Sequence, residues 1–179
     1  MSKCVRWLVV MLGVWLPLAQ APAWGQGTSA LVVEYRSVPA MLVEAQPLQV
    51  RVFADGAVEV VYPEPMRQAG VYRFALSPAE VDALQREVAK AAAFDAGEFR
   101  RRLADAQSRA RQQGRILAAR SDATIEEFVL QGAGGPMTLR LQDLDLAARR
   151  LSSWAPAQDL NRLRSELLAL AERAVEVRP

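Results

Sequence analysis

The chain has 179 residues, a formal net charge of +2 at pH 7, one cysteine and no histidine. The lack of histidine excludes Ser-His-Asp triads and histidine metal sites, and a single cysteine cannot form an internal disulfide. Lys3 and Arg6 account for the net charge, because residues 1–25 contain no acidic residue. The rest of the chain is therefore neutral, and its charge gives no reason to expect nucleic acid as a partner.

Residues 1–23 have the three zones of a secretory signal peptide. Two positive charges precede the uncharged apolar run 7–18, which is shorter than the roughly 20 residues that a spanning helix needs. Small residues follow, so we expect cleavage after Ala23 or, nearly as well, after Gly25. Cys4 lies ahead of the apolar run and not at the cleavage point, where a lipid anchor would require it. The sequence thus predicts a periplasmic or secreted protein with no stable membrane anchor and no thiol.

The remaining chain, about 155 residues, is long enough to bury one hydrophobic core. We expect a flexible start at 24–30 and a single α+β domain at 31–179. Leu31 to Ser37 alternates apolar and polar residues, which predicts a half-buried strand. Pro39 and Pro47 then bracket a connection, because proline cannot donate to a strand ladder.

A hairpin is the clearest structural signal that follows. Segments 48–53 and 57–62 flank an Ala-Asp-Gly turn. A two-residue loop would mix apolar and charged residues on each face, whereas a three-residue loop sets Val52 opposite Val58 and makes one face uniformly apolar. Burial strongly opposes a one-residue slip from that register. We therefore predict the three-residue loop, with Gly56 in the left-handed conformation that a Cβ disfavours.

Residues 70–76 predict a further strand, and a strong helix start comes next. Ser77 is a good N-cap, Pro78 suits the first helical position, and Glu80 can close a capping box. Apolar residues then recur at three- and four-residue spacing, which predicts a helix that buries one stripe against the sheet. These residues are Val81, Leu84, Val88 and Ala91.

Residues 94–120 are rich in arginine and predict either a helix, interrupted at Gly97 and Gly114, or a mobile excursion. In one interpretation the arginines bind an anionic surface or polysaccharide. In the other, which we favour, they form a solvated helix face that pairs with acids, as charge runs usually do. No aromatic residues are interleaved to stack on bases. The candidate contact residues for an anion or a partner are Arg100, Arg101, Arg102, Arg109 and Arg115.

Segments 124–130 and 137–141, joined by the glycine-rich stretch 132–136, predict a second hairpin. The glycine run does not open a helix and lacks a following Gly-Lys-Ser/Thr, so it is not a phosphate loop. A short helical turn is expected at 143–151, and a final leucine-rich helix opens at Pro156. Its heptad pattern is too short for a convincing coiled coil, so we expect it to pack on the protein's own sheet.

Between Val52 and Phe94 the chain reads FADG.V.V.Y, then GVYRFALSPAEVDAL, then AAAF. This pattern resembles a family of uncharacterised exported bacterial proteins, in which a hairpin and a strand lead into a capped helix that ends near a phenylalanine. The strand at 122–130 and the leucine-rich end are also similar. The arginine-rich stretch 100–115 departs from the shorter connection of that family. The resemblance rests on structural motifs and implies no activity, so no catalytic residue is carried over.

The expected fold is an antiparallel sheet of five or six strands with helices packed on one face.

The functional hypothesis that we favour is a non-catalytic envelope protein that binds or assembles with another protein or a polysaccharide. A second hypothesis is a hydrolase that uses carboxylates alone, with Asp143 and Asp145 or Asp95 and Glu98 as candidate pairs. A third is an anion-binding surface protein that uses the arginine-rich segment. Neither acid pair has the spacing of a calcium loop, so no metal, cofactor or catalytic residue is assigned. The oligomeric state stays open.

Overall fold

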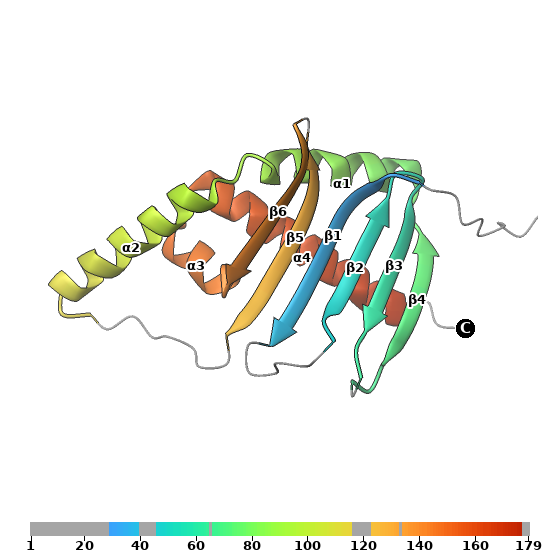
Figure 1. Ribbon diagram of the computed structural model, residues 1–179, viewed down its shortest axis with the longest axis horizontal. Helices are drawn as coiled ribbons and strands as arrows, with labels where there is room; N and C mark the ends of the chain where they lie inside the picture. Colours follow the sequence, from blue (N-terminus) through green and yellow to red (C-terminus); the bar gives the residue numbers. More distant parts are fainter. Residues whose placement is uncertain (1–28, 40–45, 65, 116–122, 133, 177–179) are drawn as a thin grey trace, which may run out of the picture.

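The computed structural model describes residues 29–39, 46–64, 66–115, 123–132 and 134–176. Within these ranges six strands form one antiparallel sheet in the order β4-β3-β2-β1-β5-β6 (Figure 1). The strands are β1 (Leu31–Pro39), β2 (Leu48–Phe53), β3 (Ala57–Tyr62), β4 (Gly70–Ala75), β5 (Thr124–Gly132) and β6 (Gly135–Gln142). The helices are α1 (Pro78–Ala91), α2 (Ala96–Gln112), α3 (Leu144–Arg150) and α4 (Ala155–Glu176). The α+β class is confirmed.

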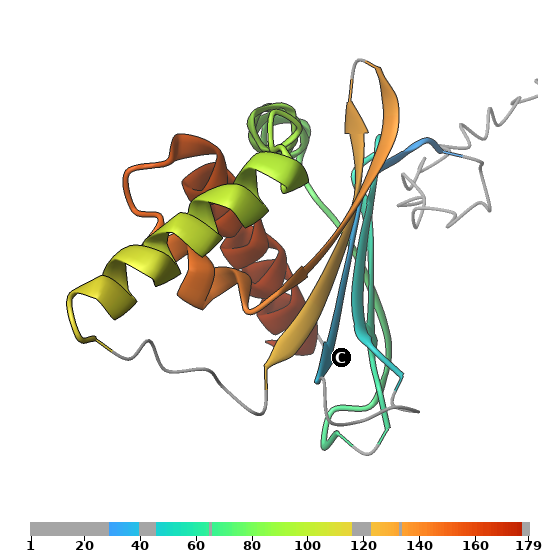
Figure 2. The ribbon, with the colours of Figure 1, turned by 60° about the vertical axis from the view of Figure 1, so that its left-hand side comes forward.

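The helices cover one face of the sheet, and side-chain alternation along the strands explains which face (Figure 2). Val52 and Val58 point toward the helices and are buried, whereas Arg51 and Glu59 lie on the opposite face as an ion pair of 3.0 Å. The same period of two runs along β5, where the inward positions are buried and the intervening ones are half-buried. One apolar face therefore supplies the sheet's half of the core.

The hairpin of β2 and β3 has the predicted three-residue loop. Val52 pairs with Val58 and Arg51 with Glu59. Gly56 is in the left-handed region, with φ of 86°, and its carbonyl accepts a hydrogen bond of 2.9 Å from the Leu76 amide. A Cβ at position 56 would lie 2.8 Å from the Leu76 carbonyl oxygen, which real Cβ atoms do not approach so closely. The turn therefore requires glycine for both conformation and space.

Helix α1 begins with the predicted capping box. The Ser77 hydroxyl accepts from the Glu80 amide at 3.3 Å, and the Glu80 carboxylate accepts from the Ser77 amide at 2.6 Å. Arg173, near the end of α4, donates to the other Glu80 oxygen at 2.8 Å. The Ser77 hydroxyl also donates to the Glu80 carboxylate at 2.7 Å, and this bond, followed by those from the Ser77 amide and Arg173, lowers the pKa of Glu80 to about 2. The start of α1 is thereby tied to the end of α4.

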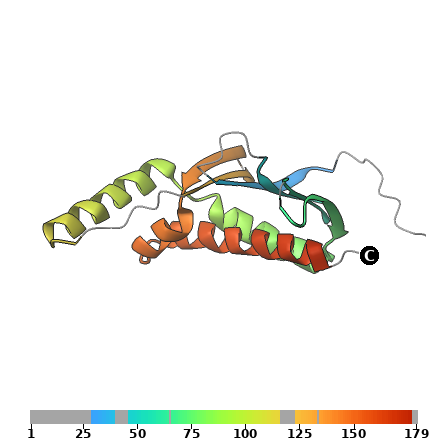
Figure 3. The same ribbon diagram turned by 90° about the horizontal axis from the view of Figure 1, so that it is seen from below.

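Helix α4 packs on the protein's own core, as predicted, beside α1 (Figure 3). Its residues Leu160, Leu163 and Leu167 are fully buried, and it contacts β2 and β4 as well as α1. None of the described helices combines the length and apolarity needed to cross a bilayer.

Two expectations about local structure were wrong. Gly97 does not interrupt α2, because it lies in the first turn and donates its amide to the Asp95 N-cap at 2.6 Å. The second hairpin has a shorter connection than 132–136, since β5 ends at Gly132 and β6 begins at Gly135. Gly114, with φ of 66°, does follow the end of α2. The last part of the predicted 94–120 segment, residues 116–122, lies outside the described residues.

At Gly56, the effect of the close contact on stability can be separated from the effect of backbone conformation by comparison with Gly114. Gly114 also has a positive φ, but a Cβ added there would have no atom within 4 Å. Gly114→Ala is expected to cost about 1 kcal/mol of unfolding free energy through conformation alone. Gly56→Ala should cost about 3 kcal/mol, because it adds a clash with the Leu76 carbonyl to the same backbone strain. Urea denaturation of both variants measures the difference. Equal losses would show that the turn has room for a Cβ.

Candidate functional site

A single carboxylate is buried between the sheet and the helices. Glu126 of β5 is 1% exposed, and it is the one charged residue that is buried in the described ranges. Strand alternation puts it on the inward face with Phe128 and Leu130. A carboxylate in such a place is stable only if hydrogen bonds and an opposite charge compensate for the lost water.

Three elements supply that compensation. One Glu126 oxygen, Oε1, accepts from the Tyr35 hydroxyl of β1 at 2.9 Å and from Nε of Arg164 in α4. The other, Oε2, accepts from the amide of Leu144, the first residue of α3, at 3.2 Å. One carboxylate therefore links the centre of the sheet to both C-terminal helices.

The electrostatics of this network favour a fixed protonation state. Burial, and then the charge of Glu126, raise the pKa of Tyr35 well above its usual range. Burial opposes the charge of Arg164, but its hydrogen bond and ion pair with Glu126 outweigh that effect, and the pKa of Arg164 is raised. Tyr35 thus remains a proton donor and Arg164 remains a cation at neutral pH. These two groups are therefore suited to holding the fold together and not to exchanging protons with a substrate.

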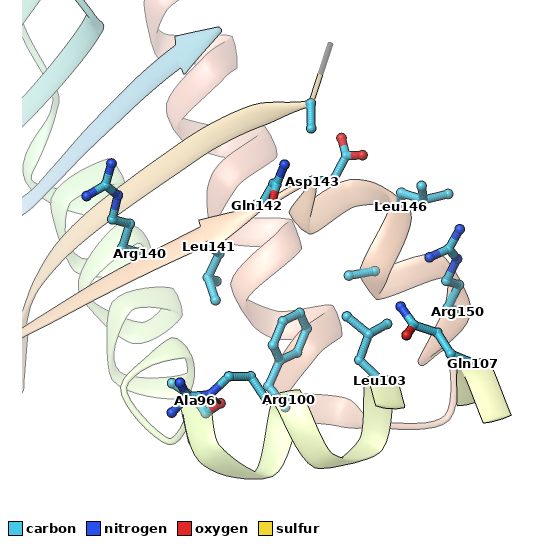
Figure 4. A pocket seen from close by; sticks show the side chains of 13 residues that line it. Ala96, Arg100, Leu103, Gln107, Arg140, Leu141, Gln142, Asp143, Leu146 and Arg150 are labelled. Atoms are coloured by element: carbon cyan, nitrogen blue, oxygen red, sulfur yellow. Dashed lines mark hydrogen bonds between the residues drawn. The ribbon is translucent and has the colours of Figure 1, made fainter. Parts of the chain in front are cut away.

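An open pocket of about 520 Å³ lies next to this network, between α2, β6 and α3 (Figure 4). Its base is apolar, because Phe99, Leu141 and Ala147 are buried there and Leu103 is half-buried. Its rim is polar and charged, with side chains from all three elements. The charged and amide residues that line it are Arg100, Gln107, Arg140, Gln142, Asp143 and Arg150.

The arginines lie at both ends of this pocket. Arg100 runs along α2 at one end, Arg150 lies near Gln107 at the other, and the Arg140 side chain points away from α2 (Figure 4). Nε of Arg100 donates to the Ala96 carbonyl at 3.2 Å, and Arg100 makes no ion pair with any carboxylate of the described ranges. Arg140 forms an exposed ion pair of 3.3 Å with Glu127 on the outer face. Arg100 therefore carries a charge on the pocket rim that no ion pair of the described ranges balances.

The other predicted arginines are arranged differently. Arg101 and Arg102 pair with Glu98 of the same helix, at 3.2 and 2.7 Å. The Arg102 guanidinium also lies 5.5 Å from the centre of the Trp154 ring. Glu98 is therefore the acid that balances this part of the helix. These contacts fit the solvated, acid-paired helix face that we favoured.

Arg109, in the last turn of α2, and Arg115, beyond its end, are exposed. Of the five predicted contact residues, only Arg100 therefore lines the pocket. Arg140 and Arg150 were missed, because they lie in a different part of the sequence and neither belongs to a local motif. Only the position of β6 and α3 beside α2 brings them to Arg100.

The candidate acid pairs do not face one another across a cleft. Asp95 is the N-cap of α2 and accepts from the Gly97 and Glu98 amides. Asp145 pairs with Arg149 on the surface of α3, whereas Asp143 lines the pocket. No group of three histidine, cysteine, aspartate or glutamate side chains in the described ranges could hold a metal ion.

A different pair of acids lies in a shallow groove between α1 and α4, which sequence reasoning did not identify. Burial, and then the charge of Glu87, raise the pKa of Glu166. The pKa of Glu87 is lowered, chiefly by a hydrogen bond from Lys90, and Arg162 approaches it at 3.5 Å. Opposite shifts of this kind accompany acid–base function in enzymes, but Glu87 is already neutralised by two cations.

Comparison with known proteins gives no family for this geometry. The chain matches no family model, no curated protein and no solved structure. The resemblance to uncharacterised exported proteins stays a prediction, and function is argued from the site.

The buried pair should show strong coupling in a double-mutant cycle. Arg164→Leu is expected to lose about 3–5 kcal/mol of unfolding free energy, because it leaves the Glu126 carboxylate buried without its counter-charge. Adding Glu126→Leu should restore part of that loss. Arg149→Leu, which breaks the exposed pair with Asp145, should change stability by less than about 1 kcal/mol. Additive losses at Glu126 and Arg164 in urea denaturation would contradict a buried pair.

Glu166 provides a test of pH dependence. Its pKa is raised in the folded state, so its ionisation opposes folding. The resulting loss of unfolding free energy appears as the pH rises above the ordinary pKa of a glutamate side chain. Glu166→Gln should therefore stabilise the protein near pH 7, by less than about 1 kcal/mol given its partial exposure, and leave it unchanged at about pH 3. Glu172→Gln, at an exposed position of the same helix, is the control. Melting curves at both pH values compare the variants, and a destabilised Glu166→Gln at neutral pH would contradict the assignment.

Proposed function

We propose that this protein is an exported binding protein whose ligand is an organic anion with an apolar portion. The pocket between α2, β6 and α3 is its binding site. The observation that carries the proposal is Arg100, which pairs with no carboxylate of the described ranges, beside a buried apolar base. Apolar surface stabilises the hydrocarbon part of a ligand by removing it from water, and guanidinium groups donate charge-assisted hydrogen bonds to carboxylate or phosphate.

Contacts within the protein hold the α2 wall of the pocket in place. Phe99 packs against Phe94, with ring centres 5.2 Å apart, and against Trp154 at 6.1 Å. The bond from Arg100 to the Ala96 carbonyl holds this arginine along the first turns of the same helix. A preformed wall lowers the conformational-entropy cost of binding.

Binding is favoured over carboxylate hydrolysis. A hydrolase of that class needs two acids facing one another across the scissile bond. The one buried acid of the described residues, Glu126, is held by Arg164, and Glu87 is held by Lys90 and Arg162. Export is supported by the signal-peptide pattern of residues 1–23. The anionic group of the ligand can belong to a free small molecule or to an acidic polysaccharide, since both carry carboxylates.

Dansylglycine, a fluorescent naphthalene derivative with one carboxylate, is a suitable probe. Arg100→Gln should weaken its binding about tenfold, because a charge-assisted hydrogen bond is lost. Arg109→Gln, which removes an equal charge from the exposed last turn of α2, should leave binding unchanged. Dansylamide, which lacks the carboxylate, should bind weakly and equally to all three proteins. Fluorescence titration measures the dissociation constants.

Equal effects of the two arginine variants, or equal affinity for both probes, would contradict the proposal. Polygalacturonate then separates the two sources of the anion. Displacement of dansylglycine by the polymer at low carboxylate concentration would point to a polysaccharide ligand, and displacement only by small carboxylates would point to a free molecule.

A further inference from the structure

Asp143, on the pocket rim, has an unusual backbone conformation. With φ of 54° and ψ of 47°, it is the only non-glycine residue of the described ranges with a positive φ. A residue with a Cβ persists in this region only when its surroundings determine it, and such residues cluster at functional sites.

Two hydrogen bonds on either side of the Asp143 Cα impose this conformation. Its own amide donates to the Thr124 carbonyl at 3.0 Å, and the next amide, of Leu144, donates to buried Glu126 at 3.2 Å. Because Glu126 is held in turn by Arg164, the strained residue is anchored to the core. The Leu144 amide is thus already used and does not contribute to an anion site.

The side chain of Asp143 is not used by the fold. It makes no capping hydrogen bond to α3 and no hydrogen bond or ion pair with any residue in the described ranges. It lines the pocket on the wall opposite α2 (Figure 4). Its carboxylate points away from α2 (Figure 4), and because an ionised carboxylate only accepts hydrogen bonds, Asp143 is an unused acceptor on a rim whose other charged residues are arginines.

We infer that Asp143 is a specificity-determining residue of this pocket, and that the ligand carries a hydrogen-bond donor, a hydroxyl or an ammonium group, beside its anionic group. The inference rests on the proposed function, since it names the class of anion that the same pocket takes. Arg100 binds the anionic group, and Asp143 accepts from the donor. A ligand with only negative charge is repelled at this wall, which gives the pocket a means of discrimination.

Three fluorescent carboxylates test the inference. Nε-dansyl-lysine has an ammonium group beside its carboxylate, N-dansyl-serine has a hydroxyl group, and dansylglycine has neither. The wild-type protein should bind at least one of the first two about tenfold more tightly than dansylglycine, through a charge-assisted hydrogen bond to Asp143. Whichever probe gains identifies the donor.

Asp143→Gly, which removes the acceptor, should abolish that preference, and Asp143→Asn, whose amide oxygen accepts without a charge, should reduce it; both should bind dansylglycine as well as the wild type or better. Asparagine tolerates the left-handed conformation, so this variant keeps the backbone, and Asp143→Gly provides a second variant without strain. If dansylglycine binds but neither donor-bearing probe binds more tightly, or if the preference survives in both variants, the inference is overturned and the anion site stands. If dansylglycine does not bind at all, the proposed function fails and the inference fails with it.

Discussion

The ion pair between Glu126 and Arg164 is the interaction on which the C-terminal half of the structure depends. A carboxylate on the inward face of β5 is tolerated only because β1, α3 and α4 each bring a donor to it. That requirement places the start of α3 against the sheet and fixes the rotation of α4 about its axis. The Glu126 network also affects the surface, since the amide that donates to Glu126 belongs to Leu144, the neighbour of Asp143. A polar group in the core thereby positions a residue of the pocket rim.

The opposite wall of the pocket depends on a different kind of contact. Phe94, Phe99 and Trp154 form an aromatic cluster between the end of α1, the start of α2 and the start of α4. This cluster anchors the first turns of α2, whereas the rest of the helix extends beyond β6 (Figure 3). Arg100 lies on the anchored part and Arg109 on the extended part. The two arginines therefore belong to the same helix but have different surroundings, which makes them a matched pair for experiment.

Local elements were predictable wherever a short-range interaction decides the structure. The three-residue turn at Gly56 and the capping box from Ser77 follow from backbone sterics and bonds over a few residues. Gly97 was misjudged, because a glycine in the first turn of a helix is tolerated when a side chain such as Asp95 caps the free amides. Glu126 did leave a local signal, since it occupies an inward phase of the alternating strand β5, next to apolar Phe128. An acid at an inward-facing position of a strand predicts that a buried partner compensates its charge, but it does not identify that partner.

The amino-acid sequence by itself determined the α+β class, the hairpin of β2 and β3, the start of α1, the lack of histidine and the lack of an internal disulfide, because these depend on composition or on contacts within a turn of chain. Only the tertiary structure decided that Arg100, Arg140 and Arg150 share a pocket and that Glu126 meets Arg164. These contacts join residues far apart in the chain, and they form because burying the apolar face of the sheet brings the helices over it. A charge that is removed from water in this way needs a partner, as Glu126 does, whereas a charge at the pocket rim, such as Asp143, does not.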